Sequence, residues 1–400
     1  MSDVATAVAA NGAGVSLSEE QRAIRETIGR LCEDFGAEYW YERDHDGRFP
    51  EEFLRAVVEG GWLGIAMPEE YGGAGLGITE ASVMMQAIAE SGAAFSGASA
   101  VHLNIFGLNP VVVAGTEEQK ARMLPPLIRG ENRACFAVTE PNAGLDTTNI
   151  TTTATRTNSG YVVNGRKIWT STAQTADKVL LLARTSPKPA DGKRAEGLTL
   201  FYTDFDRDYV EAREIEKMGR KAVDSNAVFI DGLPVPEEDR IGEEGKGFYY
   251  LLHGLNPERI LVAVEAVGIA RAAIRRACEY AGEREVFGRP IGQNQAIAHP
   301  LARAWAEVEA ANLMAYRAAA LYDAGEECGA ESNAAKYLAG EAAFRACETA
   351  VMCHGGMGYA KEFHVERYLR EVMIARIAPV SREMILNYIA ERVLGLPRSY

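Results

Sequence analysis

The segment Ala137-Val-Thr-Glu-Pro-Asn-Ala-Gly-Leu-Asp146 lies where the chain changes from helical to strand-like patterning. Before it, residues 17–133 show helical patterning. After it, up to about residue 240, Thr-rich and alternating apolar stretches are typical of strands. The segment itself is a short apolar run followed by Pro141 and Gly144, so its residues alone predict a strand that ends in a turn. The sequence therefore predicts helices before this segment and a β domain that begins near it.

Local signals support this division and extend it to the C-terminus. Capping boxes at Ser18 and Thr116 predict two helix starts in the N-terminal part. Asn164-Gly165 predicts a hairpin turn between strands, and helical spacing returns after Gly247. The order helix, β, helix predicts an α+β fold without alternating βαβ units. The expected parts are a mobile tail at 1–16, an N-terminal all-α domain at 17–133, a middle β domain at 134–240 with a surface loop at 187–192, and a C-terminal helical domain at 241–400.

The composition bounds the class of protein. With 400 residues and 47% hydrophobic content, the chain can bury large cores and is not a disordered protein. A formal net charge of −14 argues against nucleic acid as the main partner. The six cysteines lack a CxxC pair and the six histidines lack metal-ligand spacing, so we expect no disulfide framework, no metal site and a cytoplasmic location. No apolar run approaches the ~18 residues of a membrane span. Dinucleotide, P-loop and hydrolase-elbow motifs are absent.

Three segments could carry chemistry, and each also has an ordinary structural explanation. Residues 137–146 offer backbone N–H groups and a hydroxyl to a flat polar ring or a diphosphate, or they are simply a strand and its turn. Residues 164–172 could stack Trp169 on an aromatic cofactor, or Trp169 could be a core residue. The glycines of His354-Gly-Gly-Met-Gly-Tyr359 indicate a break in a helical region, which permits close backbone approach or forms a plain turn.

Together these segments are more specific than any one alone. The chain contains, in order, Thr139-Glu-Pro141, Ala143-Gly-x-Asp146, Lys167-x-Trp169, Arg284-x-x-Phe-Gly288 and Gly355-Gly-x-Gly-Tyr359. With further matches from residue 19 to the end, the sequence resembles the acyl-CoA dehydrogenase family. The resemblance implies an N-terminal helical domain, a middle β domain like a barrel or sandwich, and a C-terminal four-helix bundle, assembled as a homotetramer or homodimer. It also implies FAD as cofactor, an acyl-CoA substrate and an electron-transfer flavoprotein as acceptor.

The resemblance implies two groups of cofactor-binding residues. The first group would lie along the flavin ring and diphosphate within one subunit: Phe136, Val138, Thr139, Gly144, Leu145, Trp169 over one ring face, and Ser171 near the redox nitrogen. The second group would reach the diphosphate and adenosine from a neighbouring subunit: Arg284, Phe287, Gln295, Met352, Gly355 and Gly356. Ser381 completes the set. Leu145, Val286 and Met352 replace polar residues usual in the family, and each replacement costs a hydrogen bond worth ~1 kcal/mol.

The catalytic position departs from the family's common pattern. In the matching stretch Ile377-Ala-Pro-Val-Ser381, Pro379 stands where the base Glu usually lies. Isovaleryl- and long-chain-type members carry the base instead on a helix that begins near the position of Glu258, so Glu258 is expected to remove the α-proton. The alternative is that Glu258 is an ordinary first-turn Glu favoured by the helix dipole. The residues expected to line the acyl-CoA site are Asn256, Arg259, Ala378 and Pro379.

Pro379 also leaves alternative functions open. Proline has no N–H with which to hold the thioester oxygen, and the loss of one such donor costs roughly 10²–10³ in rate. Either Ala378 donates instead, or another group substitutes, or the thioester reaction is not the main activity. The expected function is α,β-dehydrogenation of an acyl-CoA. The alternatives are another flavoenzyme on the same scaffold, such as a flavin monooxygenase or an enoyl-CoA reductase, and a non-catalytic acyl-CoA-binding scaffold.

Overall fold

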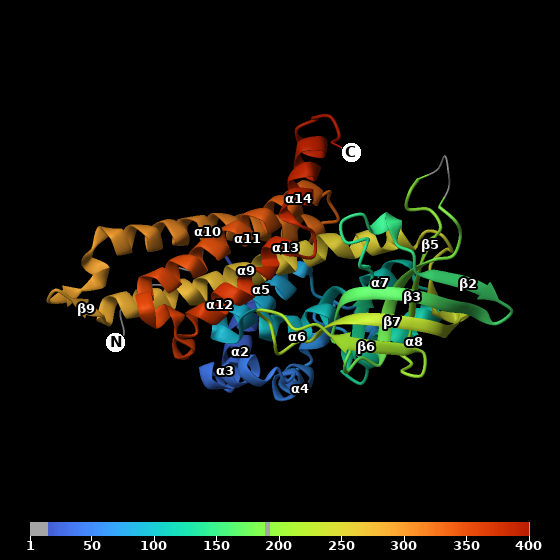
Figure 1. The fold of residues 1–400 in the computed structure, drawn as a ribbon, viewed down its shortest axis with the longest axis horizontal. Helices are drawn as coiled ribbons and strands as arrows, with labels where there is room; N and C mark the ends of the chain where they lie inside the picture. The colour runs from blue at the N-terminus through green and yellow to red at the C-terminus, as the bar shows by residue number, and fades with distance from the viewer. Residues whose placement is uncertain (1–14, 189–192, 400) are drawn as a thin grey trace.

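The computed structural model describes residues 15–188 and 193–399. Most of the expected N-terminal tail, and residues 189–192 of the expected surface loop, lie outside the described residues. Figure 1 shows long helices at one end of the molecule, the β-sheet at the other and the N-terminal helices alongside both. The order helix, β, helix is therefore confirmed.

The N-terminal part is helical, and both predicted capping boxes are present. The Oγ of Ser18 accepts a hydrogen bond from the backbone N–H of Gln21 (3.1 Å), and Thr116 does the same for Gln119 (3.2 Å). Each cap satisfies a backbone donor that the first helical turn leaves free. The α-helices are α2 (Glu19–Glu33), α3 (Ala37–Asp46), α4 (Glu51–Glu59), α5 (Ile78–Ile88), α6 (Ala94–Phe106), α7 (Asn109–Ala114) and α8 (Glu117–Ile128).

The middle part forms one curved sheet. Its strands are β1 (Ala134–Ala137), β2 (Thr153–Thr157), β3 (Gly160–Ser171), β4 (Lys178–Arg184), β5 (Leu198–Asp204), β6 (Val210–Glu214), β7 (Ser225–Pro236) and β8 (Arg240–Ile241). The strand order is β6-β7-β3-β2-β4-β5-β8, and β1 pairs in parallel with β4. Alternate residues of β4 enter two cores. Leu181 packs inside the curve with Tyr161 and Phe201, whereas Leu180 packs on the face that meets α7 and α8.

The predicted hairpin turn at Asn164-Gly165 is wrong. Both residues lie within β3, where the pairing with β7 shifts register, and the tight turn instead joins Thr157 to Gly160. A Cβ on Gly165 would come within 2.3 Å of the Thr152 hydroxyl oxygen, so this glycine serves a close approach between backbone segments. Asn164 accepts a hydrogen bond from the backbone N–H of Gly232 through its side chain (2.8 Å). Asn164 and Gly165, which have high turn propensity, therefore form a bulge within β3.

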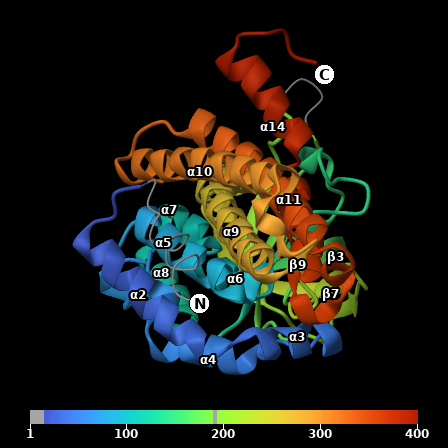
Figure 2. The same ribbon diagram turned by 90° about the vertical axis from the view of Figure 1, so that its left-hand side faces the viewer.

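The C-terminal part is a bundle of long helices. Figure 2 shows α10, α11 and α9 packed side by side, and the short helices that follow α11 take the fourth position against α11 and α9. The helices are α9 (Gly247–Glu283), α10 (Gln295–Asp323), α11 (Gly329–His354), α12 (Val365–Val372), α13 (Ile374–Ile377) and α14 (Arg382–Tyr388), with a small hairpin of β9 (Glu285–Val286) and β10 (Arg289–Pro290) after α9. The glycines after His354 do end α11, as predicted.

A single apolar core joins the N-terminal helices to the bundle, because α5 and α6 pack against α9. The stretch Ile78–Ala114 is long and apolar enough to span a membrane by length and composition. It is interrupted at Gly92, whose φ is 108°, and side chains such as Met84 and Val101 are buried in this core. Its apolar character is therefore used for packing within the protein.

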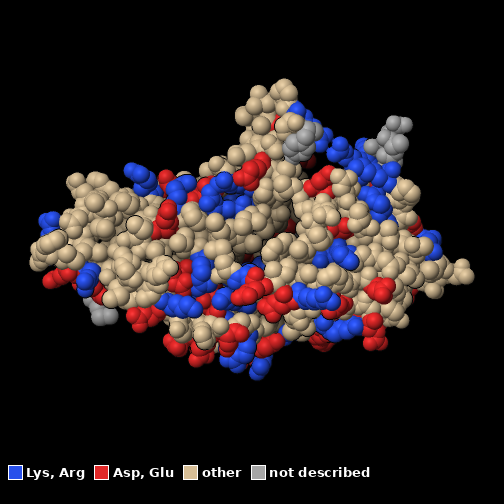
Figure 3. All heavy atoms as spheres, viewed as in Figure 1, with Lys and Arg blue, Asp and Glu red and all other residues tan. Residues whose placement is uncertain are grey.

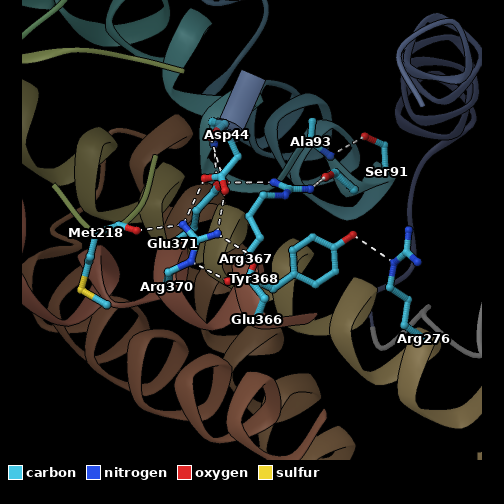
Figure 4. Close-up of polar contacts among 12 residues, drawn as sticks. Asp44, Ser91, Ala93, Met218, Arg276, Glu366, Arg367, Tyr368, Arg370 and Glu371 are labelled. Atoms are coloured by element: carbon cyan, nitrogen blue, oxygen red, sulfur yellow. Dashed lines mark hydrogen bonds and ion pairs between the residues drawn. The ribbon is translucent and has the colours of Figure 1, made fainter. Parts of the chain in front are cut away.

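Arg370 on α12 ties three parts of the chain together (Figure 4). Its guanidinium donates to both carboxylate oxygens of Asp44 on α3 (3.0 and 2.7 Å) and to the backbone carbonyl of Met218, which lies between β6 and β7 (2.8 Å). Glu366, one turn earlier on α12, accepts two further bonds from it (2.6 and 2.9 Å). The network holds the β6–β7 connection against both helical regions.

Candidate active site

The first group of expected cofactor residues lies around the end of β1. Phe136 is partly buried on β1, Val138 is buried just after it, and Gly144 and Leu145 are exposed in the following turn. The backbone carbonyl of Thr139 accepts a hydrogen bond from the N–H of Ile168 on β3 (2.9 Å). This bond brings β3 beside the segment 137–146, so the structure places the two sequence motifs together.

A buried ion pair fixes this junction. The Lys167 ammonium donates to Glu140 (3.0 Å) and to the backbone carbonyls of Val138 (3.1 Å) and Leu182 (2.7 Å). Burial lowers the pKa of Lys167 to about 8, although Glu140 opposes this shift. Burial alone would raise the pKa of Glu140, but Lys167 and the backbone N–H groups of Thr151 and Thr152, just before β2, bring it down to about 2. The motif residues Glu140 and Lys167 therefore hold the segment 137–146 and β3 in register.

Trp169 and Ser171 present side chains at this junction. Trp169 is 56% exposed, and its φ of 61° lies in the left-handed region, which is uncommon for a bulky residue. It is not a core tryptophan, so the structural alternative for this residue is excluded. Such exposure and strain at a motif residue are typical of a ligand contact. The Ser171 hydroxyl accepts a hydrogen bond from Arg220 (2.9 Å).

The second group of expected cofactor residues lies at the opposite end of the bundle. Its members are exposed, with Phe287 at 101% and Met352 at 73%. The Tyr280 ring stacks on His354 (4.4 Å between centroids), which places the turn after α11 beside the end of α9. The whole group is Arg284, Phe287, Gln295, Met352, Gly355 and Gly356. Within one chain this group lies far from Trp169. This separation agrees with the expectation that a second subunit brings the group to the cofactor.

Glu258 lies well inside α9, which begins at Gly247. The expectation that a helix starts near Glu258 is therefore wrong. The alternative that Glu258 is an ordinary first-turn residue of a helix is wrong for the same reason. Its Oε2 atom is buried with no hydrogen-bond partner. Burial raises the pKa of this carboxyl to about 7, against the lowering effect of His102 and Arg259.

Charged residues from three helices surround Glu258. On α6, His102 Nδ1 lies 2.5 Å from Oε1 of Glu265, which is on α9. Burial lowers the pKa of His102, but Glu265 and Glu258 together raise it above its ordinary value. Arg259 donates to Asn256 (3.0 Å), and Lys336 on α11 donates to the backbone carbonyl of Val380 (2.7 Å). The carboxyl group of Glu258 is therefore buried close to several cationic side chains.

The loop after α13 contains the departure from the family pattern. The N–H of Ala378 donates to the carbonyl of Ile374 (2.9 Å), so it is committed within the chain, and Pro379 has no N–H. The expectation that Ala378 donates to the thioester oxygen therefore finds no support. The Ser381 hydroxyl accepts from Met384 (3.3 Å) and caps α14, so this expected cofactor residue has a structural role here.

Comparison with known proteins identifies the family. The N-terminal, middle and C-terminal domain models of acyl-CoA dehydrogenases match residues 18–131, 135–233 and 245–394. The chain belongs to the acyl-CoA dehydrogenase family. As a member, it is an oxidoreductase that acts on CH–CH bonds of acyl-CoA.

Individual members of the family match along nearly their whole length. Acyl-CoA dehydrogenase FadE12 of Mycobacterium tuberculosis is 39% identical over 96% of this chain and 98% of that protein. The structure of butyryl-CoA dehydrogenase from Megasphaera elsdenii matches with a TM-score of 0.90 and 30% identity, covering 95% of this chain and 99% of that one. An FAD complex of PigA matches with a TM-score of 0.89 and 25% identity, over 96% and 99%. These relatives imply a flavin in this acyl-CoA dehydrogenase as well.

Several buried or partly buried charged residues of this acyl-CoA dehydrogenase were not found by sequence reasoning. They are His102, Arg220, Glu265 and Lys336. Glu265 interrupts an apolar run in α9, and His102 stands in an apolar stretch of α6. A charged residue on the buried face of a helix is a signal that could have found these two. Arg220 and Lys336 had no such signal, because their neighbours in the sequence are mixed.

The residues of the first group fit a flavin nucleotide. Trp169 offers an exposed apolar surface, and a Cβ added to Gly144 would meet nothing within 4 Å, so the backbone there is open to approach. The glycines 355 and 356 are open in the same way at the far end of the bundle. In the described part of the chain no group of His, Cys, Asp and Glu is arranged to hold a metal ion.

Proposed function

We propose that this protein is an FAD-dependent acyl-CoA dehydrogenase in which Glu258 removes the α-proton of the acyl thioester. The observation that supports this is that the Oε2 atom of Glu258 is buried without a hydrogen-bond partner. Burial also favours the neutral, protonated form of this carboxyl group. A general base works best when its pKa is near the working pH, and a pKa of about 7 meets that condition. We also propose that the base occupies the same position in this protein as in isovaleryl- and long-chain-type members of the family.

Glu258 has the surroundings of a functional carboxylate and not of a structural one. Structural buried carboxylates in this chain are paired. Glu140 bonds Lys167 (3.0 Å) and Glu371 bonds Arg367 (3.0 Å). The carboxyl of Glu258 feels His102, Arg259 and Lys336 only as nearby charges. A carboxylate that burial destabilises and no partner binds is free to accept a proton from a ligand.

The cofactor proposal uses both groups of residues. Phe136 to Leu145, Trp169 and Ser171 would hold FAD on one subunit, while Arg284, Phe287, Gln295 and the turn at Met352 to Gly356 would reach it from a second. We therefore propose a homotetramer or homodimer, a cytoplasmic location and an electron-transfer flavoprotein as acceptor. When bound, the flavin supplies an acceptor for the β-hydrogen. Asn256 and Arg259 are proposed to line the acyl-CoA site beside Glu258, with Ala378 and Pro379 closing it.

Pro379 supports a second candidate, another reaction on the same scaffold, such as flavin monooxygenation or enoyl-CoA reduction. Oxyanion stabilisation normally needs a preorganised donor, and the N–H of Ala378 is committed to Ile374. Exposure of the reduced enzyme to oxygen separates the candidates. A hydroxylated product would favour the monooxygenase, and slow reoxidation would favour the dehydrogenase.

The test is anaerobic addition of a panel of acyl-CoAs to the yellow, FAD-loaded protein. We expect at least one acyl-CoA to bleach the flavin absorbance, and Glu258→Gln to abolish bleaching while FAD stays bound. Glu279→Gln is the matched control, because Glu279 is an exposed residue on the same helix. Normal bleaching by Glu258→Gln would overturn the assignment of the base. A colourless protein that takes up no FAD would instead support a non-catalytic scaffold.

A further inference from the structure

His102 on α6 and Glu265 on α9 form an ion pair inside the helical core. The Nδ1 atom of His102 lies 2.5 Å from Oε1 of Glu265, and the two side chains are only 12% and 2% exposed. The preceding residues on the two helices, Val101 and Val264, are fully buried apolar side chains. A buried ion pair seldom makes a fold more stable than well-packed apolar residues would. Stability alone therefore does not explain why two charged groups lie here.

Two other buried histidines show what burial does to an imidazole whose surroundings do not favour a charge. The Nδ1 atom of His354 lies 2.7 Å from the neutral carbonyl oxygen of Ala350, and burial lowers the pKa of this ring. Burial and two nearby arginines lower the pKa of His364 to about 4. Both rings are therefore neutral at pH 7. Burial also acts to lower the pKa of His102, but its carboxylate partner raises it above its ordinary value, so this ring carries a positive charge inside the protein.

The pair lies close enough to Glu258 to act on its charge. Glu258 and Glu265 are seven positions apart on α9, which is roughly two helical turns, so their side chains project from the same side of this helix. The helix that carries His102, α6, packs against α9. Burial raises the pKa of Glu258, and among the charges around this carboxyl His102 has the largest effect and lowers the pKa. The imidazolium therefore opposes the effect of burial on the candidate base.

The charges around Glu258 lie inside the protein, where they act strongly on one another. On the face shown in Figure 3, cationic and anionic side chains are intermixed on the surface, where water and salt screen them. Inside a protein such screening is weak. Glu265 raises the pKa of Glu258, so without His102 its carboxylate would be an uncompensated negative charge beside the base. The other charged groups that face the base or His102 are Arg220 on the β6–β7 connection, Arg259 on α9 and Lys336 on α11.

We propose that His102 and Glu265 are a positioning pair for the dehydrogenation, in which the imidazolium of His102, held by Glu265, keeps Glu258 ionised and ready to accept the α-proton. This inference rests on the proposed function. Neither residue of the pair takes part in the proton transfer, because the imidazolium keeps its proton and the α-proton goes to the carboxylate of Glu258. A nearby opposite charge favours the ionised form of a carboxyl group. The pair thus allows a carboxyl inside the protein to work as a base near neutral pH.

The test is the pH profile of flavin bleaching by a good acyl-CoA in the FAD-loaded protein, measured by stopped-flow absorbance from pH 5.5 to 9.5. His102→Gln removes the cation and leaves the carboxylate of Glu265, so we expect the midpoint of the profile to rise by about one pH unit. Bleaching at pH 6 should then be about tenfold slower, whereas the plateau rate above pH 9 should change by less than about threefold. His102→Lys, which keeps the positive charge, should shift the midpoint much less.

The double variant His102→Gln/Glu265→Gln separates an effect of charge from an effect of packing. It removes one positive and one negative charge, so it should return the midpoint at least halfway to that of the unmodified protein. A midpoint that does not move in His102→Gln, or that moves as far in the double variant, would overturn the inference. A loss of rate that is equal at every pH would also overturn it, because His102 would then serve the fold. His45→Gln is the matched control, because His45 is exposed on α3, and it should leave the profile unchanged.

A measurement on the unmodified protein decides the case in which His102→Gln does not fold. Nitrogen-15 NMR of protein with labelled histidines reports the charge of the six imidazole rings. We expect one ring to stay protonated above pH 8 and to lose this property in Glu265→Gln, whereas six neutral rings at pH 8 would overturn the inference. The proposed function fails separately, if Glu258→Gln bleaches normally or no acyl-CoA bleaches the unmodified protein. Bleaching that needs Glu258 but keeps its midpoint in His102→Gln would overturn this inference alone.

Discussion

Replacing Glu258 by Gln should stabilise the folded protein at pH 8. Burial raises the pKa of this carboxyl from 4.5 to about 7, so the charged form is disfavoured in the native state. Each tenfold change in an equilibrium constant corresponds to ~1.4 kcal/mol, so the charge costs about 3 kcal/mol of folding free energy above pH 7. Gln resembles the neutral acid in shape and carries no such cost.

The sign of the pH dependence follows from the raised pKa. Below pH 4.5 the carboxyl is protonated in both the native and the unfolded state, so the cost is absent there, and it grows as the pH rises towards 7. Urea unfolding of the FAD-loaded protein at pH 8 and at pH 4.5 measures the difference. We expect Glu258→Gln to gain about 3 kcal/mol at pH 8 and almost nothing at pH 4.5. The control Glu279→Gln should change little at either pH. A Gln variant that is no more stable than the unmodified protein at pH 8 would refute the reasoning.

Two further predictions follow from the buried charges. The rate of flavin bleaching by a good acyl-CoA should rise about tenfold per pH unit up to about pH 7 and then level off, because Glu258 must be ionised to accept the proton. The charged groups that face Glu258 are His102 on α6, Arg259 and Glu265 on α9, and Lys336 on α11. Stopped-flow absorbance measures this rate, and a flat profile between pH 5.5 and 7 would contradict the prediction. Lys167→Met should destabilise the protein by about 3–5 kcal/mol, because it leaves the buried Glu140 without its cation, and adding Glu140→Gln should recover part of the loss in urea unfolding. If Lys167→Met proves no more harmful than Lys246→Met, whose exposed lysine pairs with Glu243, the buried pair has no such role.

The sequence was a good guide to the elements and a weaker one to turns. The capping boxes at Ser18 and Thr116 are confirmed because a cap depends on residues three positions apart. Asn164-Gly165 failed as a turn because tertiary contacts with Thr152 and Gly232 use the same residues for a bulge. The return of helix after Gly247 is confirmed, because α9 begins at that residue, whereas the helix start expected near Glu258 is wrong.

The site shows the same limit more sharply. The motifs containing Thr139 and Trp169 could be found by their spacing, and the structure brings them together through one backbone bond. The sequence also indicated that a proline stands at 379. It did not show that the N–H of Ala378 is committed to Ile374, because that bond closes the short helix α13 (Ile374–Ile377), which the sequence patterns did not predict.

By itself, the sequence determined the order of helices and strands, the likeness to a flavin-dependent family and the identity of the candidate base. These depend on residue type and on spacing along the chain, which a sequence contains in full. Only the tertiary structure decided that Glu258 is buried without a partner, that His102 pairs with Glu265 and that Arg220 bonds Ser99. His102 and Glu265 are 163 positions apart and Ser99 and Arg220 are 121 apart, so no local pattern contains these contacts.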